Sequence, residues 1–183
     1  PAANAILFDS TGRLLIATGE PGKVGTVLRF DPRGSGRMET LLDVPEGYGG
    51  RLFQATGMAW YEGDLLVASK GDGKVKRYDG ETGQWEADVA LAAPVGWQQS
   101  AVHERRLVVT DSIAQALRRA PEQLKGSMSE IWTQLSGQSP GGLALDAAGR
   151  AYWSSSTNRI FRFDGQANVE WAGALGSNQT PTA

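Results

Sequence analysis

Short apolar runs separated by polar turns recur along this chain at a regular spacing. Four runs of three residues occupy comparable places, at 14–16, 65–67, 107–109 and 151–153. Each run is too short for a helix and lies among Gly, Asp and Ser residues, which is typical of buried strands. Glycine, at 24 of 183 residues, also favours many turns over long helices. The pattern therefore predicts short strands joined by tight turns.

The runs belong to a longer repeated unit. Residues 57–79 align without a gap on residues 142–164, at an offset of 85. The two stretches share five residue pairs: Gly57/Gly142, Ala59/Ala144, Ser69/Ser154, Arg77/Arg162 and Asp79/Asp164. A weaker copy between them places Thr110 on Ser154 and Arg118 on Arg162, and a first copy spans residues 6–31. Four units in 183 residues give a period of about 45, which is the range of propeller blades.

Each unit contains signals for four strands. Asp9 to Gly12 and Asp146 to Gly149 predict hairpin turns, because Asp bonds the local backbone and Gly accepts positive φ. A third strand ends on an Arg-aromatic-Asp triplet, and a Trp follows it on an expected fourth strand, at Trp85, Trp132 and Trp171. The sequence thus predicts an all-β chain of about four four-stranded propeller blades. The expected blades are 1–50, 51–92, 93–138 and 139–176, with 177–183 beginning a further one.

One segment allows a second interpretation. Residues 112–124 contain good helix formers, and Ser112 could cap a helix there. Pro121 would interrupt that helix, and the repeat places the same residues on a third strand. We therefore expect a strand over 114–119, followed by a longer excursion, helical or not, through 121–130.

The two ends of the chain resemble the start of a unit, as seen at residues 139–143. Four blades can close a ring, but this arrangement favours a cut within a larger propeller of the six-bladed type. An open arc would expose sheet faces made for a neighbouring blade. We therefore expect another protein, or a second copy, to complete or cover the propeller.

Composition excludes several classes of protein. A formal charge of −2 and a pI near 5.5 do not provide the basic footprint of a nucleic-acid-binding protein. The chain has no Cys and a single histidine, His103, which excludes thiolate and multi-histidine metal sites. No apolar run approaches the roughly 20 residues of a membrane span. The compartment is open, with a lean toward an extracellular or periplasmic one.

The units resemble those of the NHL-repeat and SMP-30/gluconolactonase-like six-bladed propellers. The resemblance covers nearly the whole chain and is carried by residues 139–149, by Pro94 to Gly96, and by Val108 to Ser112. In the SMP-30-like lactonases, a divalent cation is held by a Glu and by the Asn and Asp of P-N-G and P-D-G motifs. Here the Asn position is Val95 and the Asp position is Gly141; only Asp111, in a T-D-S motif, matches. The resemblance implies the fold, and we expect no metal in this chain. A calcium site would require ligands that lie outside this chain, as in the hydrolase alternative given below.

Six residues are candidates for binding. Glu20, Asp111 and Ser155 follow the second strand of their units, so they could share a rim around the propeller axis. Trp97, Gln98 and Gln99 lie at the start of a unit and could face the central channel.

Other notable residues have structural interpretations. The arginines that recur at one blade position are expected to pair with carboxylates; they are Arg29, Arg77, Arg118 and Arg162. His103 is expected to be a solvated turn residue, and Gly71 to Lys74 a strand connection. No Gly-x-Ser-x-Gly nucleophile turn is present.

These features favour a non-catalytic propeller that binds a protein, a glycan or a small ligand through its rim loops. One alternative is a metal-dependent SMP-30-like lactonase or esterase whose ligands lie outside this chain. A second is a fragment of a quinoprotein-like sugar dehydrogenase using pyrroloquinoline quinone.

Overall fold

The protein is described by a computed structural model. It covers residues 2–34, 36–42, 44, 49–89, 97–104, 106–120, 124, 130–135 and 137–172. Over this part of the chain, every extended regular element is a β-strand. No helix among the described residues is long and apolar enough to cross a membrane.

The strands form four antiparallel sheets, each built from consecutive strands. Blade 1 contains β1 (Ala3–Phe8), β2 (Leu14–Thr18), β3 (Val24–Phe30) and β4 (Met38–Leu42), and the short β5 (Leu52–Phe53) also pairs with β3. Blade 2 contains β6 (Ala55–Tyr61), β7 (Asp64–Ser69), β8 (Lys74–Asp79) and β9 (Trp85–Val89). Blade 3 contains β10 (Trp97–His103), β11 (Arg106–Asp111), β12 (Ala116–Arg119) and β13 (Glu130–Gln134). Blade 4 contains β14 (Pro140–Leu145), β15 (Ala151–Ser155), β16 (Ile160–Phe163) and β17 (Asn168–Ala172).

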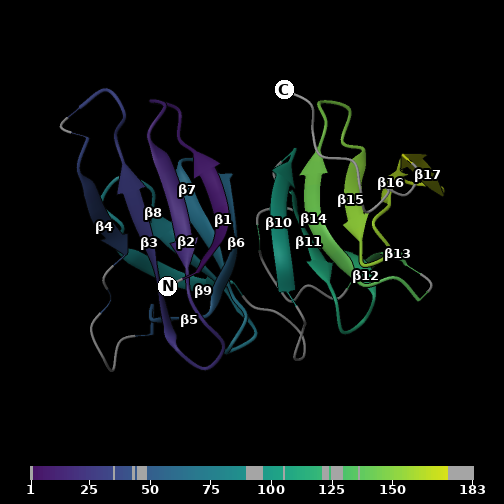
Figure 1. The fold of residues 1–183 in the computed structure, drawn as a ribbon, viewed down its shortest axis with the longest axis horizontal. Coiled ribbons are helices and arrows are strands. Elements are labelled where there is room, and N and C mark those ends of the chain that lie inside the picture. The colour runs from purple at the N-terminus through teal and green to yellow at the C-terminus, as the bar shows by residue number, and fades with distance from the viewer. Residues whose placement is uncertain are drawn as a thin grey trace.

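The blades stand around a common axis with their first strands innermost (Figure 1). β1 packs on β6, β6 on β10, and β10 on β14, so neighbours in sequence are neighbours in space. The chain is therefore an all-β propeller of four four-stranded blades, as the repeat predicted.

The core consists of three seams, each between two consecutive blades. Leu15, Ala17 and Val27 of blade 1 pack on Met58, Val67 and Tyr78 of blade 2. The other face of blade 2 buries Tyr61, Leu66 and Val75 against Leu107 and Val109 of blade 3. Trp153 and Phe163 of blade 4 pack on Leu117 and Leu135 of blade 3. Both faces of an inner blade are thus apolar, which explains why the second strands are continuous apolar runs.

The predicted turns and outer strands are confirmed. Asp9 Oδ1 accepts bonds from the amides of Thr11 and Arg13, and Asp146 Oδ1 accepts from Ala148 and Arg150 in the same way. The three predicted tryptophans lie on the fourth strands β9, β13 and β17.

The strand prediction for residues 114–119 is also correct in kind. β12 begins at Ala116, after a turn over residues 112–115. The helix that competed with it does not form over residues 112–120. Most of the excursion predicted for 121–130 lies outside the described residues.

The gapless alignment of the repeat was wrong by one residue on the second strand. Tyr61 pairs with Asp64 across a two-residue turn, whereas Asp146 pairs with Arg150 across three residues. Because the turn in blade 4 is longer, Ser69 corresponds to Ser155 and not to Ser154.

The same register also corrects the set of arginines that recur at one position of the third strand. Arg77 pairs with Leu66, Arg162 with Tyr152 and Arg119 with Val108, so Arg119 occupies the position that the alignment gave to Arg118. The equivalent residues are therefore Arg29, Arg77, Arg119 and Arg162.

Candidate ligand-binding cleft between blades 3 and 4

The predicted channel residue Gln99 lies where the innermost strands meet. Its side-chain amide donates to the carbonyl of Asn4 in blade 1 and to that of Thr56 in blade 2, at 3.3 Å each. The Asn4 amide donates in turn to Ala55 at 2.7 Å. Gln99 thus joins three blades near the axis. Trp97 and Gln98 belong to β10, but their side chains lie outside what the structure describes.

Asp111 and Ser155 lie at equivalent positions, at the end of the second strand, and both are buried. Asp111 Oδ1 accepts from the amides of Ile113 and Ala114, and its Oδ2 lies 2.7 Å from Arg118 Nε. Ser155 Oγ accepts from the amide of Thr157. These bonds shape the turn that follows the strand, which is a structural task.

Glu20 lies in the loop between β2 and β3, where its carboxylate is 2.5 Å from Lys23 Nζ. The predicted rim of Glu20, Asp111 and Ser155 is therefore distributed over three blades. The bonds described for these side chains remain within each blade. Their part in binding stays a prediction.

A polar clasp spans the seam between blades 1 and 2, beside a hollow of about 490 Å³ that Arg13 and Glu81 help to line. Arg13, in the β1–β2 turn, reaches both carboxylate oxygens of Glu81 in the β8–β9 turn, at 3.1 and 2.6 Å. Arg29 donates to the backbone carbonyl of Glu81 at 2.8 Å. The hydrogen bond from Arg13 lowers the pKa of Glu81. Two arginines of one blade thus hold the acidic turn of the next.

The seam between blades 3 and 4 has arginines at both clasp positions, but a different residue at the position of Glu81. Arg106 and Arg119 occupy the positions of Arg13 and Arg29. In the facing turn of blade 4, Asp164 Oδ1 accepts from the amide of Gln166, just as Asp79 Oδ1 accepts from Glu81. Gln166 therefore stands where blade 2 has Glu81. A neutral amide replaces the carboxylate at this seam.

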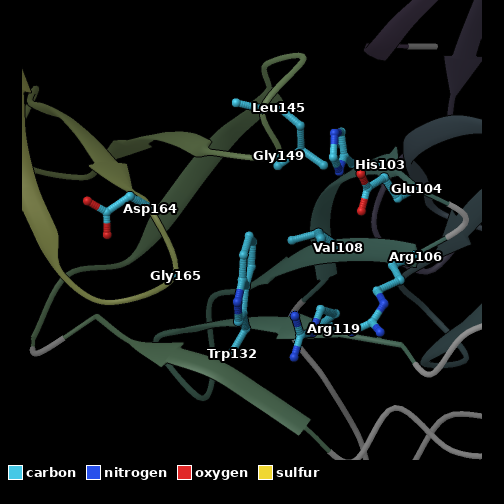
Figure 2. A pocket seen from close by; sticks show the side chains of 11 residues that line it. His103, Glu104, Arg106, Val108, Arg119, Trp132, Leu145, Gly149, Asp164 and Gly165 are labelled. Atoms are coloured by element: carbon cyan, nitrogen blue, oxygen red, sulfur yellow. The ribbon is translucent and has the colours of Figure 1, made fainter.

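A cleft of about 650 Å³ opens along this seam. Arg106, Arg119, Trp132, His103 and Glu104 line it, together with the turns of blade 4. The Trp132 indole projects into the cleft beside Val108 and Arg119, whereas the Asp164 carboxylate points away from it (Figure 2).

Packing fixes the position of the aromatic ring. Trp132 meets Phe163 edge-on, with ring centroids 5.0 Å apart. The guanidinium of Arg119 lies over the indole at 5.5 Å from its centroid. Arg119 over the indole and Phe163 beside it therefore hold the ring in place as part of the cleft wall.

His103 closes one end of the cleft. Its Nε2 lies 3.2 Å from the carbonyl of Ala147. Its ring also packs so closely on Gly149 that a side chain there would lie 2.8 Å from the imidazole. We expected His103 to be a solvated turn residue, and the structure places it at a turn, packed between two blades.

One acidic cluster has a suitable geometry for a metal among the described residues, formed by Asp64, Asp79 and Glu86. Arg77 lies within this cluster: its Nε is 3.0 Å from Glu86, and its guanidinium contacts Asp64. The cluster therefore already has its cation.

Arg29 and Arg77 confirm the predicted pairing of recurring arginines with carboxylates, Arg29 with Glu39 at 2.6 Å. The calcium ligand position at Val95 lies outside the described residues.

Sequence reasoning missed the cleft. The alignment selected Arg118, which turns to Asp111, instead of Arg119, which faces blade 4. Trp132 was interpreted only as an outer-strand residue. The available signal was the difference between Glu81 and Gln166, which becomes informative only when the blades are superposed by register.

The comparisons with known proteins show the fold alone. No family model matches the chain, and no curated protein matches it. A structure of a nidogen/laminin complex has a TM-score of 0.72 and 16% identity, covering 93% of this chain and 66% of that chain. Virginiamycin B lyase from Staphylococcus aureus has a TM-score of 0.68 and 15% identity, covering 94% and 56%. The computationally designed Ika4 protein has a TM-score of 0.61 and 13% identity, covering 88% and 90%.

The chain thus spans just under two thirds of the nidogen/laminin chain and little more than half of the lyase chain. These similar structures support a β-propeller. They do not confirm the more specific resemblance to the NHL-repeat and SMP-30-like families.

Proposed function

We propose that this propeller is a non-catalytic binding module whose ligand occupies the cleft between blades 3 and 4. One observation carries the proposal: Arg106 and Arg119 occupy the clasp positions, while Gln166 stands where Glu81 completes the clasp between blades 1 and 2. A carboxylate on a ligand would take the place that Glu81 fills between blades 1 and 2.

The expected ligand is an acid that also carries a ring. Its carboxylate would meet the guanidinium groups, and its ring would lie against Trp132. A volume of about 650 Å³ admits a sugar acid of one or two rings. We therefore favour uronic-acid-type glycans among the glycan and small-molecule ligands.

Two of the similar structures support a binding role, whereas virginiamycin B lyase is an enzyme. One is a complex of nidogen and laminin, and another is the extracellular domain of a putative hybrid two-component system from Bacteroides thetaiotaomicron. Propellers of this fold therefore occur in protein complexes and outside cells. We extend both properties to this chain: a protein partner at its sheet faces, and an extracellular or periplasmic location. A six-bladed ancestry of the NHL or SMP-30 type is part of the same proposal.

Calorimetric titration with glucuronate and with glucose tests the proposal. We expect glucuronate to bind and glucose to bind at least tenfold more weakly, because only glucuronate brings a carboxylate to the arginines. Arg106→Gln should abolish the difference, whereas Trp132→Ala should weaken the binding of glucuronate by removing the contact with its ring. Trp171→Ala removes an exposed tryptophan of blade 4 that does not line the cleft, and it should leave binding unchanged.

Two results would overturn the proposal. One is that neither ligand binds the folded wild-type protein. The other is that glucuronate binds equally well to Arg106→Gln protein of unchanged melting temperature, which would place the binding site outside the cleft.

A further inference from the structure

On its face directed away from blade 3, blade 4 has arginines at the positions of Arg13 and Arg29, the two donors of the clasp. Arg150 follows Asp146 as Arg13 follows Asp9, with Nε to carboxylate distances of 2.6 and 2.5 Å. Arg162 pairs across the sheet with Tyr152, as Arg29 pairs with Leu15. The two arginines that hold Glu81 in blade 1 therefore have direct counterparts in blade 4.

The apolar part of the seam is repeated with them. Tyr152, Ile160 and Trp171 occupy the places of Leu15, Val27 and Leu41. Leu15 and Leu41 are 1% and 8% exposed beneath blade 2, whereas Trp171 is 59% exposed. Tyr152 and Trp171 meet edge-on at 5.2 Å and border an apolar hollow of about 490 Å³. We call this surface, with Arg150 and Arg162, the blade-4 face.

The polar groups of this face are only partly satisfied. Arg162 Nε is buried and has no hydrogen-bond partner within the described chain. Its counterpart Arg29 bonds Glu39 within the blade and the Glu81 carbonyl across the seam. Val169 stands where blade 1 has Glu39, which explains why Arg162 Nε has no acceptor within the blade. The cross-seam bond of Arg29 comes from a terminal nitrogen, and that is the bond an acceptor on a partner would reproduce at Arg162.

Blade 1 of a second copy of this chain does not supply that acceptor. The first blade offers the turn after β3, where Asp31 Oδ1 accepts from the amide of Arg33. Asp79 accepts from Glu81 in the same turn of blade 2, so Arg33 occupies the position of Glu81. Blade 1 of another copy would therefore bring an arginine to Arg150. Like charges at this point oppose self-association.

We propose that the blade-4 face docks a β-sheet of a partner protein that carries a carboxylate in its hairpin turn. The inference rests on the partner-binding part of the proposed function and specifies its chemistry. The apolar face of the partner would cover Tyr152 and Trp171, and its acid would bond Arg150 and Arg162 as Glu81 bonds Arg13 and Arg29. Two observations support this partner: the blade-4 face has the same arrangement as the face of blade 1 that packs on blade 2, and its two arginines give it a positive charge.

A variant of this chain can test whether the blade-4 face requires an acidic turn on its partner. Arg33→Glu gives blade 1 the acidic turn that blade 2 has, beside the exposed Ile6 and Phe8. Native mass spectrometry should show wild-type protein as single chains and Arg33→Glu protein as species of two or more chains. Lys23→Glu, an equal change of charge in another turn, should remain a single chain.

A second substitution locates the contact. Arg33→Glu combined with Arg150→Glu should return the protein to single chains, with the melting temperature of each variant confirming that it is folded. The proposal fails if folded Arg33→Glu protein stays single, or if the double variant still associates. It also fails if wild-type protein associates and Arg150→Glu abolishes that association, because a second copy would then be the occupant. Titration with glucuronate on the same variants reports the cleft separately, so either proposal can fail alone.

Discussion

Arg13 of the first blade and Glu81 of the second form a two-bonded ion pair across 68 residues of sequence, at 3.1 and 2.6 Å. The pair joins two turns that lie outside the apolar core of the seam. Exposed pairs of this kind contribute little to stability on their own. Its value here is positional, because the pair shows which residues of one blade face the β8–β9 turn of the next.

The first prediction concerns acid stability. Burial by itself raises the pKa of Asp9, but bonds from Arg13 and Thr11 outweigh it and hold the pKa at about 2, below the ordinary 3.8. A lowered pKa in the folded state stabilises the protein above pH 3.8, and that contribution is lost as the pH falls toward 2. Asp9→Asn should remove about 2 kcal/mol at pH 7 and flatten this part of the curve. Urea unfolding at several pH values measures it; an unchanged slope in Asp9→Asn would contradict it.

The second prediction uses two equivalent glycines. A side chain at Gly57 would lie 2.9 Å from the backbone of Gln99 and Ser100, on the next innermost strand. At Gly142, the same position of blade 4, it would meet only the Ser154 hydroxyl at 3.3 Å. Gly57→Ala should therefore lower the free energy of unfolding by about 2 kcal/mol, and Gly142→Ala by much less. Chemical denaturation of both variants decides this, and equal losses would show that β6 and β10 are not packed so closely.

The third prediction separates a structural role from a binding role at Asp111. The carboxylate is fully buried and pairs with Arg118, so Asp111→Ala should leave a cation without its partner and cost about 3 kcal/mol. Asp111→Asn keeps an acceptor for the turn amides and should cost less. Thermal unfolding measures both. Loss of ligand binding by folded Asp111→Asn protein would instead support the predicted rim site.

The fourth prediction concerns the recurring third-strand arginines. Arg77 lies among Asp64 and Glu86 and over the Tyr61 ring at 5.7 Å. Arg77→Ala should lower stability by about 1 kcal/mol and leave ligand binding unchanged, because the contacts join strands of one blade. The equivalent Arg119→Ala should weaken binding in the cleft. Titration of both variants with glucuronate tests the difference, and equal effects on binding would contradict it.

Much of the fold could be predicted from local pattern. Apolar runs of three residues, Asp-to-Gly turns and the third-strand triplets are set by neighbours in sequence, so the strands, the hairpins and the blade repeat followed from them. The turn after β14 shows the limit: one extra residue moved Ser155, not Ser154, into the position of Ser69. A gapless alignment has no means of seeing that insertion, because a compensating residue is missing before β16.

The candidate site depended on the tertiary structure. Which face of a strand an arginine uses is decided by register, and a shift of one residue exchanges the two faces. Arg118 consequently turns to Asp111, while Arg119 faces Trp132 and the next blade. The sequence by itself determined that four similar sheets would form and stack in order. Only the tertiary structure decided which seam brings an acid to its arginines and which brings a neutral amide, because that depends on a side chain and its partner in different blades.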